Sequence, residues 1–132
     1  MKTLFTAFLV LNFLAEALAA TSLIGAETGL SAALNNTLDK AVDNDPTQSQ
    51  FWSMHYGFAV IAIASAIAWV WPHRSNRAVV TAVLGILITF HVALFCSLAL
   101  EGTQTAGIVL HAVLALMAIT LFGLRGRWCH EH

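Results

Sequence analysis

The sequence predicts an all-α membrane protein, an antiparallel four-helix transmembrane bundle with a short amphipathic helix in its outer loop. Of its 132 residues, enough for a single domain, 58% are hydrophobic and 10% are charged, whereas about a quarter of the residues of a soluble domain are charged. Four apolar segments each approach the roughly 20 residues that cross a bilayer. None alternates as a strand does, and a helix satisfies its own backbone hydrogen bonds in lipid.

Polar sequence separates the predicted spans, which cover about residues 4–23, 51–71, 78–100 and 106–124. Pro72 follows the second span and disfavours its continuation as a helix. The polar stretch PHRSNR then leads to the third span. Only EGTQT joins the third span to the fourth, which predicts a tight antiparallel hairpin.

The first span has a second interpretation. Its basic start, its apolar stretch and the sequence Ala17-Leu18-Ala19 are similar to a secretory signal peptide with a cleavage site. Apolar residues continue after Glu16 as far as Ile24, however, so we expect the segment to be retained as a transmembrane helix.

The basic residues predict the orientation of the four spans. Lys40 falls on one side of the membrane, and the other five basic residues fall on the opposite side: Lys2, Arg74, Arg77, Arg125 and Arg127. By the positive-inside rule the richer side is cytoplasmic, so both termini are expected inside and residues 25–50 and 101–105 outside. The predicted location is the inner membrane of a bacterium. The net charge of −1 does not suggest a nucleic-acid partner.

The outer loop, residues 25–50, contains a helical pattern. Leu30, Leu34 and Leu38 recur at helical spacing, with polar and acidic residues between them. This spacing predicts a short amphipathic helix that lies at the outer membrane surface. We expect its apolar face to cap the bundle, and the alternative is a surface on which a partner protein docks.

Each predicted span also contains one acidic or imidazole side chain in its outer half. Helical rise places these groups between roughly 6 and 15 Å below the outer ends of their spans. A bundle brings such positions together if they face inward. The predicted intramembrane polar cluster, with two polar neighbours on the same helices, consists of Asn12, Glu16, His55, Tyr56, His91 and His111.

Ionisable groups inside a membrane indicate function by default. Three roles are open: hydrogen-bonded residues that fix helix register, a proton-relay or ligand-binding site around Glu16, and a metal or haem b site. The metal candidates are Glu16, His55, His91 and His111. Their depths spread over roughly 9 Å, which is broad for one ion, and His91 and His111 differ by roughly 6 Å, which disfavours a bis-histidine haem. The sequence therefore favours no cofactor.

The C-terminal sequence WCHEH contains further metal-capable groups. Its spacing is not that of a structural zinc site, so we expect a frayed polar tail. Cys96 and Cys129 do not form a disulfide framework. The sequence contains no hydrolase triad, phosphate-binding loop or dinucleotide fingerprint, so an enzyme that acts alone on a soluble substrate is not expected.

Three stretches carry a resemblance to a known type of protein: LNFLAEALAA, HYGFAVIAIASAIAW and HVALFCSLALEGTQTAGIVLHAVLAL. In layout the chain resembles small bacterial four-helix membrane proteins of the broad DoxX-like type. The resemblance covers most of the chain and implies a four-helix membrane fold. Some proteins of this type are small membrane subunits of quinone-linked oxidoreductases.

The predicted function is that of a structural or accessory subunit of a larger membrane complex, or of a self-associating bundle. Its expected partners are the lipid bilayer and either other membrane subunits or further copies of itself. The first alternative is an electron-transfer protein whose intramembrane histidines ligate haem or a metal. The second is a proton-coupled carrier or small-ligand binder that uses Glu16.

Overall fold

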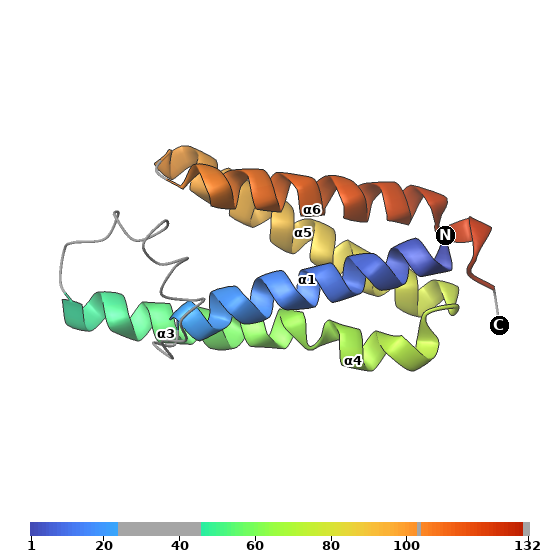
Figure 1. Cartoon of the computed structure of the whole chain (residues 1–132), viewed down its shortest axis with the longest axis horizontal. Helices are drawn as coiled ribbons and strands as arrows, with labels where there is room; N and C mark the ends of the chain where they lie inside the picture. Colours follow the sequence, from blue (N-terminus) through green and yellow to red (C-terminus); the bar gives the residue numbers. More distant parts are fainter. Residues whose placement is uncertain (24–45, 103, 131–132) are drawn as a thin grey trace. The chain divides into compact units, whose positions relative to one another are not determined.

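The computed structural model describes the backbone of residues 1–23, 46–102 and 104–130, and their side chains except at residues 22 and 46–54. These parts of the chain are helical and contain no strand (Figure 1). The elements are α1 (Lys2–Leu23), α3 (Pro46–Ala64), α4 (Ala66–Val70), the 3-10 turn η1 (Trp71–His73), α5 (Arg77–Glu101), α6 (Thr105–Leu124) and the 3-10 turn η2 (Arg125–Arg127). The predicted amphipathic helix with Leu30, Leu34 and Leu38 lies outside the described residues.

Within the described parts, four helical stretches are long and apolar enough to cross a membrane. They run over Lys2–Thr21, His55–His73, Arg77–Glu101 and Thr105–Arg127, with mean hydropathies of 1.8, 1.4, 2.4 and 2.3. Their number and positions confirm the prediction of four long apolar helices.

The chain divides into two compact units. The first consists of Met1–Asn12 and Ala66–His132, and the second of Phe13–Ser65. Helix α1 therefore contributes its first half to one unit and its second half to the other, whereas α5 and α6 belong wholly to the first unit. The second unit contains the remainder of α1 together with α3.

The second apolar stretch is not the single unbroken helix that the sequence predicts. Ser65 separates α3 from α4. Its hydroxyl donates to the carbonyl oxygen of Ala62 at 2.7 Å. Serine hydroxyls that bond to the preceding turn compete with the helical pattern and often bend helices. The interruption lies at the boundary between the two units.

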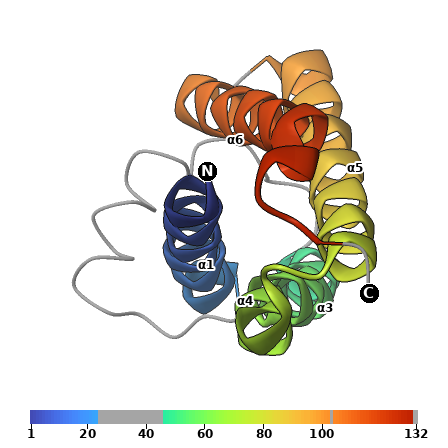
Figure 2. The same cartoon turned by 90° about the vertical axis from the view of Figure 1, so that its right-hand side faces the viewer.

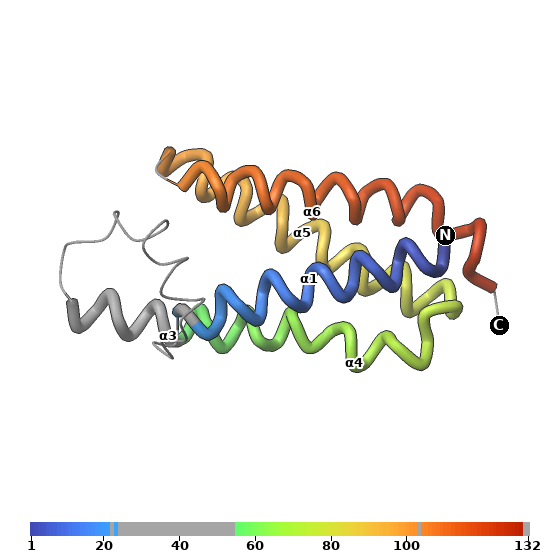
Figure 3. Tube along the Cα trace, in the orientation of Figure 1, coloured from blue at the N-terminus to red at the C-terminus, as the bar shows by residue number. Residues whose placement is uncertain are grey.

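Helices α5 and α6 form the predicted antiparallel hairpin (Figure 3). Asn76 caps the start of α5 by accepting a hydrogen bond from the Val79 amide at 3.1 Å. Gly102 ends α5 in the left-handed conformation, with φ of 73°, which glycine adopts without a steric penalty. A Cβ atom at Gly107 would lie 3.0 Å from Leu98 Cδ1, so a glycine here permits the two helices to approach closely.

Helical spacing explains which side chains form the core of the first unit. On α5, Val80, Leu84 and Leu87 recur on one face and are fully buried. The other helices of the unit contribute buried side chains at similar spacing, namely Phe5, Phe8 and Leu9 from α1 and Leu114, Ala115, Ala118 and Leu121 from α6.

The C-terminal segment packs against the first unit as far as His130, so the prediction of a frayed tail is wrong for these residues. Trp128 is only 8% exposed, and its ring lies 5.9 Å from that of Phe5. The His130 amide donates to Ser75 O at 2.9 Å, and His130 O accepts from the Arg77 amide at 3.3 Å. Figure 2 shows this segment running from the end of α6 back to the start of α5.

The reason is a need for hydrogen-bond acceptors at the start of α5. The first amides of a helix have no partner within the helix. Arg77 is the first residue of α5, and the carbonyl of His130 accepts from its amide. A sequence reading of the tail alone does not reveal this partner, because the two segments are more than 50 residues apart in the chain.

Candidate functional site: an Asn–His–His chain

Three polar side chains from three helices meet inside the first unit. His91 of α5 is fully buried, Asn12 of α1 is 2% exposed, and His111 of α6 is partly buried. His91 Nε2 lies 2.7 Å from Asn12 Oδ1. His91 Nδ1 lies 3.1 Å from His111 Nδ1. The three residues form one continuous hydrogen-bonded chain, which we call the Asn–His–His chain.

The chemistry of the amide fixes the direction of this chain. An amide oxygen only accepts hydrogen bonds, so His91 Nε2–H donates to Asn12 Oδ1. A neutral His91 then has its lone pair on Nδ1, and His111 Nδ1–H donates to it. In this arrangement the lone pair of neutral His111 is on Nε2, at the partly exposed end of the Asn–His–His chain.

Apolar and aromatic side chains lie next to these polar atoms. The ring of Phe90 is in a T-shaped arrangement with both imidazoles, with centroids 5.2 Å from His91 and 6.4 Å from His111. One helical turn away along each helix stand Phe8, Leu87 and Leu114, all fully buried. Apolar side chains therefore adjoin the Asn–His–His chain along all three helices, and an unsatisfied polar group in this buried position would be costly.

The structure brings together three of the six residues of the predicted polar cluster. Glu16 is 2% exposed and lies on the half of α1 that belongs to the second unit. His55 and Tyr56 are exposed side chains of α3, also in the second unit. The membership of Glu16, His55 and Tyr56 in one site with the two histidines stays a prediction.

The contact between His91 and His111 corrects the depth estimate made from the sequence. That estimate put the two side chains roughly 6 Å apart along the membrane normal. It counted residues from the helix ends and ignored both the inclination of the helices and the reach of the imidazoles. The ends of the two helices lie ten residues from His91 and six residues from His111, so a count from the turn does not pair these positions.

The direct contact also bears on the haem alternative. Axial nitrogens bound in line to one iron lie about 4 Å apart, for two metal–nitrogen bonds of about 2 Å, with the porphyrin between them. His91 and His111 have Nδ1 atoms 3.1 Å apart and ring centroids 5.3 Å apart. This arrangement does not fit a haem held between the two histidines.

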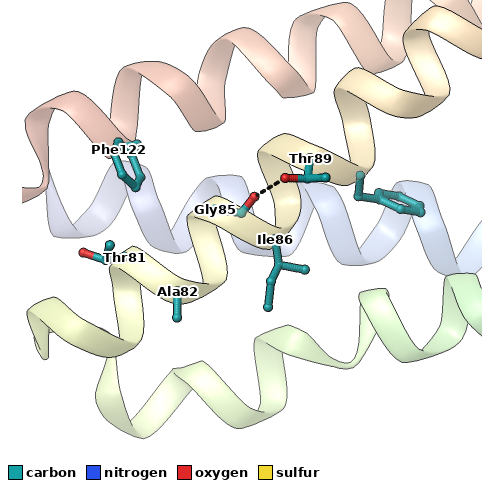
Figure 4. A pocket seen from close by; sticks show the side chains of 7 residues that line it. Thr81, Ala82, Gly85, Ile86, Thr89 and Phe122 are labelled. Atoms are coloured by element: carbon teal, nitrogen blue, oxygen red, sulfur yellow. Dashed lines mark hydrogen bonds between the residues drawn. The ribbon is translucent and has the colours of Figure 1, made fainter.

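A second feature of the first unit is an open apolar groove along α5. It encloses about 660 Å³ and is lined by Thr81, Ala82, Gly85, Ile86, Thr89, Phe90 and Phe122 (Figure 4). The Thr89 hydroxyl donates to Gly85 O at 3.0 Å, as the dashed line in Figure 4 marks, so the threonine is satisfied within its own helix. A Cβ atom at Gly85 would meet nothing within 4 Å. We call this surface the Gly85 groove.

Comparison of the chain with protein-family models, with curated protein sequences and with solved structures finds no match. The resemblance to proteins of the DoxX-like type therefore stays a prediction. What the chain does is inferred from its own residues, above all from the Asn–His–His chain and the exposed apolar surface of its helices.

Proposed function

We propose that the chain is an integral protein of a bacterial inner membrane that crosses the bilayer four times as an antiparallel bundle and serves as a structural or accessory subunit. The observation that carries this proposal is the combination of four long apolar helices with large apolar side chains on their outer surfaces. Among these side chains, Phe58 is 56% exposed, Leu116 is 65% exposed and Leu100 is 89% exposed. Such surfaces are unfavourable in water and favourable against lipid.

The distribution of charge in the first unit supports an orientation with both termini in the cytoplasm. Arg125 Nε donates to Thr81 Oγ1 at 2.9 Å, so the end of α6 lies beside the start of α5. The contact between Phe5 and Trp128 brings the start of α1 to the same end. All the basic residues of the unit belong to these segments and to the neighbouring turn: Lys2, Arg74, Arg77, Arg125 and Arg127. One basic end agrees with the positive-inside rule.

Aromatic side chains mark the same end. Trp69 is 76% exposed and Trp71 is 43% exposed. The Arg74 guanidinium lies 4.6 Å from the centre of the Trp71 ring, and Arg74 Nη1 donates to Trp71 O at 2.7 Å. Tryptophan and arginine together are typical of the boundary between hydrocarbon and water.

Reporter fusions test the topology. Green fluorescent protein fused after His73 is expected to fluoresce, because this turn is cytoplasmic in the proposed orientation. Alkaline phosphatase fused after Gly102 is expected to be active, because this turn is outside. The reciprocal fusions are expected to be silent. Phosphatase activity after His73 would overturn the proposed orientation, and release of the full chain from membranes by alkaline carbonate would overturn the membrane assignment.

The Gly85 groove supports the accessory role. In membranes, helices associate through close packing at small residues rather than through burial of apolar area. Gly85 faces open space, and the Thr81 and Thr89 side chains beside it are small. A transmembrane helix of a second copy or of another subunit could approach the backbone of α5 at this point.

Native mass spectrometry after purification in mild detergent tests this role. The wild-type chain is expected as an oligomer or with a co-purifying subunit, and Gly85→Leu is expected to reduce the assembled fraction. Gly123→Leu, at a glycine of α6 that also faces open space and does not line the groove, serves as the matched control. A monomeric wild-type chain that retains no other protein would contradict the proposal.

A further inference from the structure

The Asn–His–His chain contains more chemistry than helix packing requires. A proton that arrives at His111 Nε2 can be passed on through the shared Nδ1 contact to His91. It can go no further, because the Asn12 amide oxygen accepts a hydrogen bond and has no proton to release. The Asn–His–His chain is therefore not a continuous proton path. The role that remains for Asn12 is to hold His91 in the tautomer whose Nδ1 lone pair faces His111.

The two Nδ1 atoms are spaced like neighbouring ligands of one metal ion. Two nitrogens bound to a tetrahedral ion at 2.0–2.1 Å are separated by roughly 3.3 Å. The observed separation of His91 Nδ1 and His111 Nδ1 is 3.1 Å. A shift of a few tenths of an ångström, by rotation of the partly exposed His111 side chain, would bring both lone pairs onto a common ion.

The surroundings of His91 match those of a metal-bound histidine. A ligating imidazole usually donates its other ring N–H to an oxygen acceptor, which fixes the ring orientation and tautomer. Asn12 Oδ1 is such an acceptor, 2.7 Å from His91 Nε2 and nearly fully buried. Neutral imidazole nitrogens suit zinc, cobalt, nickel and copper ions.

We propose that His91 and His111 bind a divalent transition-metal ion of the zinc class through their Nδ1 atoms, with Asn12 as a positioning residue. Without the ion, the Nδ1 proton of His111 occupies the space between the rings. On binding, this proton leaves Nδ1 and a proton is taken up at Nε2, so both imidazoles stay neutral and no net proton is released. Water or further ligands complete the coordination of the ion. The inference does not depend on the accessory role, since it concerns a site within the first unit.

Cobalt(II) is the probe for the first experiment, because tetrahedral cobalt absorbs in the visible range. The full chain, purified in mild detergent and stripped with a chelator, is titrated with cobalt chloride and then with zinc chloride. One saturable equivalent per chain is expected, with bands of tetrahedral cobalt that zinc abolishes. His91→Gln and His111→Gln are each expected to remove these bands. His73→Gln, which changes an exposed histidine outside the site, is the matched control and is expected to retain them.

Substitutions of Asn12 separate a metal site from simple packing. Asn12→Asp keeps an acceptor for His91 Nε2–H and is expected to bind cobalt at least as tightly as the wild-type chain. Asn12→Leu removes the acceptor and is expected to weaken binding about 10- to 100-fold. A purely structural role would change the unfolding temperature of these variants without any metal-dependent difference.

Several results would overturn the proposal. Absence of tetrahedral cobalt bands at millimolar metal in the wild-type chain is one. Bands that persist in the His91→Gln, His111→Gln double variant would assign the metal to other residues. Circular dichroism of each variant shows whether it has folded. If the glutamine variants do not fold, the nitrogen-15 shifts of the imidazoles in the wild-type chain, with and without zinc, decide the matter, because unchanged Nδ1 shifts would also exclude binding there.

Discussion

The interior and the C-terminal end of the first unit satisfy their polar groups in different ways. In the interior, the helix backbones are already paired, and side chains alone connect Asn12, His91 and His111. At the end, the connections run mainly through backbone groups, as in the pairing of His130 with Ser75 and Arg77. The interior depends entirely on particular residue types at particular positions, whereas the end combines backbone pairing with side-chain contacts such as that of Arg125 with Thr81.

The ends of helices explain this difference. The first amides and the last carbonyls of a helix have no partner within it. The carbonyl of His130 accepts from the Arg77 amide at the start of α5. At the end of α6, Arg125 Nη1 donates to Phe122 O, and its guanidinium lies 3.9 Å from the centre of the Phe122 ring. In the middle of the helices no such groups are available.

The largest effect is expected from His91→Leu, which breaks the Asn–His–His chain at its centre. The substitution leaves Asn12 Oδ1 and His111 Nδ1 without their His91 partner in the interior of the unit. Each unsatisfied buried group is worth roughly 1–3 kcal/mol, so the free energy of unfolding is expected to fall by about 3 kcal/mol. Reversible unfolding in mixed micelles, followed by circular dichroism, measures this change.

The matched control for His91→Leu replaces all three residues of the Asn–His–His chain with leucine. The triple variant Asn12→Leu, His91→Leu, His111→Leu removes the three hydrogen-bonding side chains together and is expected to recover most of the lost stability. If the triple variant is less stable than the single variant, apolar packing cannot substitute for the hydrogen bonds, and the contrast between interior and end would be smaller than described.

A smaller effect is expected from Trp128→Ala at the C-terminal end. Removal of a large buried ring from a core costs roughly 3–5 kcal/mol. Within the described residues, however, the buried Trp128 Nε1–H has no hydrogen-bond partner, which offsets part of the benefit of burial. We therefore expect Trp128→Ala to lower the free energy of unfolding by about 2 kcal/mol. Trp128→Phe retains an aromatic contact with Phe5 and should change little; equal losses for both variants would show that the contact is not what holds the tail.

The same contrast explains what the sequence could predict. The four apolar helices follow from length and composition, and the hairpin follows from the short polar stretch between residues 101 and 105. The break at Ser65 did not follow, because a serine in an apolar run gives no sign of whether its hydroxyl bonds to Ala62. The packing of His130 did not follow either, since its partners are distant in sequence.

For the candidate site, residue type was predictable and geometry was not. Asn12, His91 and His111 were identified because polar groups in apolar helices need a reason to be there. The depth difference of the two imidazoles was used against a shared metal ion or haem, and it did not predict their direct contact. Contacts between side chains depend on where helices cross and on which rotamers fit, and neither is present in a count of residues.

Two glycines allow a packed helix surface to be compared with an open one. At Gly107 an added Cβ would lie 3.0 Å from Leu98 Cδ1, whereas at Gly85 it would meet nothing within 4 Å. Gly107→Ala is expected to lower the free energy of unfolding by about 1 kcal/mol, because the methyl group crowds the hairpin. The higher helix propensity of alanine offsets part of this loss. Gly85→Ala is expected to raise the free energy of unfolding of the monomer by about 0.5 kcal/mol, because alanine has the higher helix propensity. Equal changes at the two positions in thermal unfolding would contradict the close approach of α5 and α6 at Gly107.

The smallest expected effect concerns the reactivity of Cys129, beside Trp128 in the packed tail. Burial raises the pKa of this thiol, and the nearby Arg125 and Arg77 guanidiniums lower it in part. Because the thiolate is the reactive form, alkylation of Cys129 in a Cys96→Ser background should reach its half-maximal rate at a higher pH than in the unfolded chain. Arg125→Met removes one favourable charge and should move the half-maximal pH further upward. A half-maximal pH at or below that of the unfolded chain would show that the guanidiniums outweigh burial, and that charge rather than packing dominates this end of the unit.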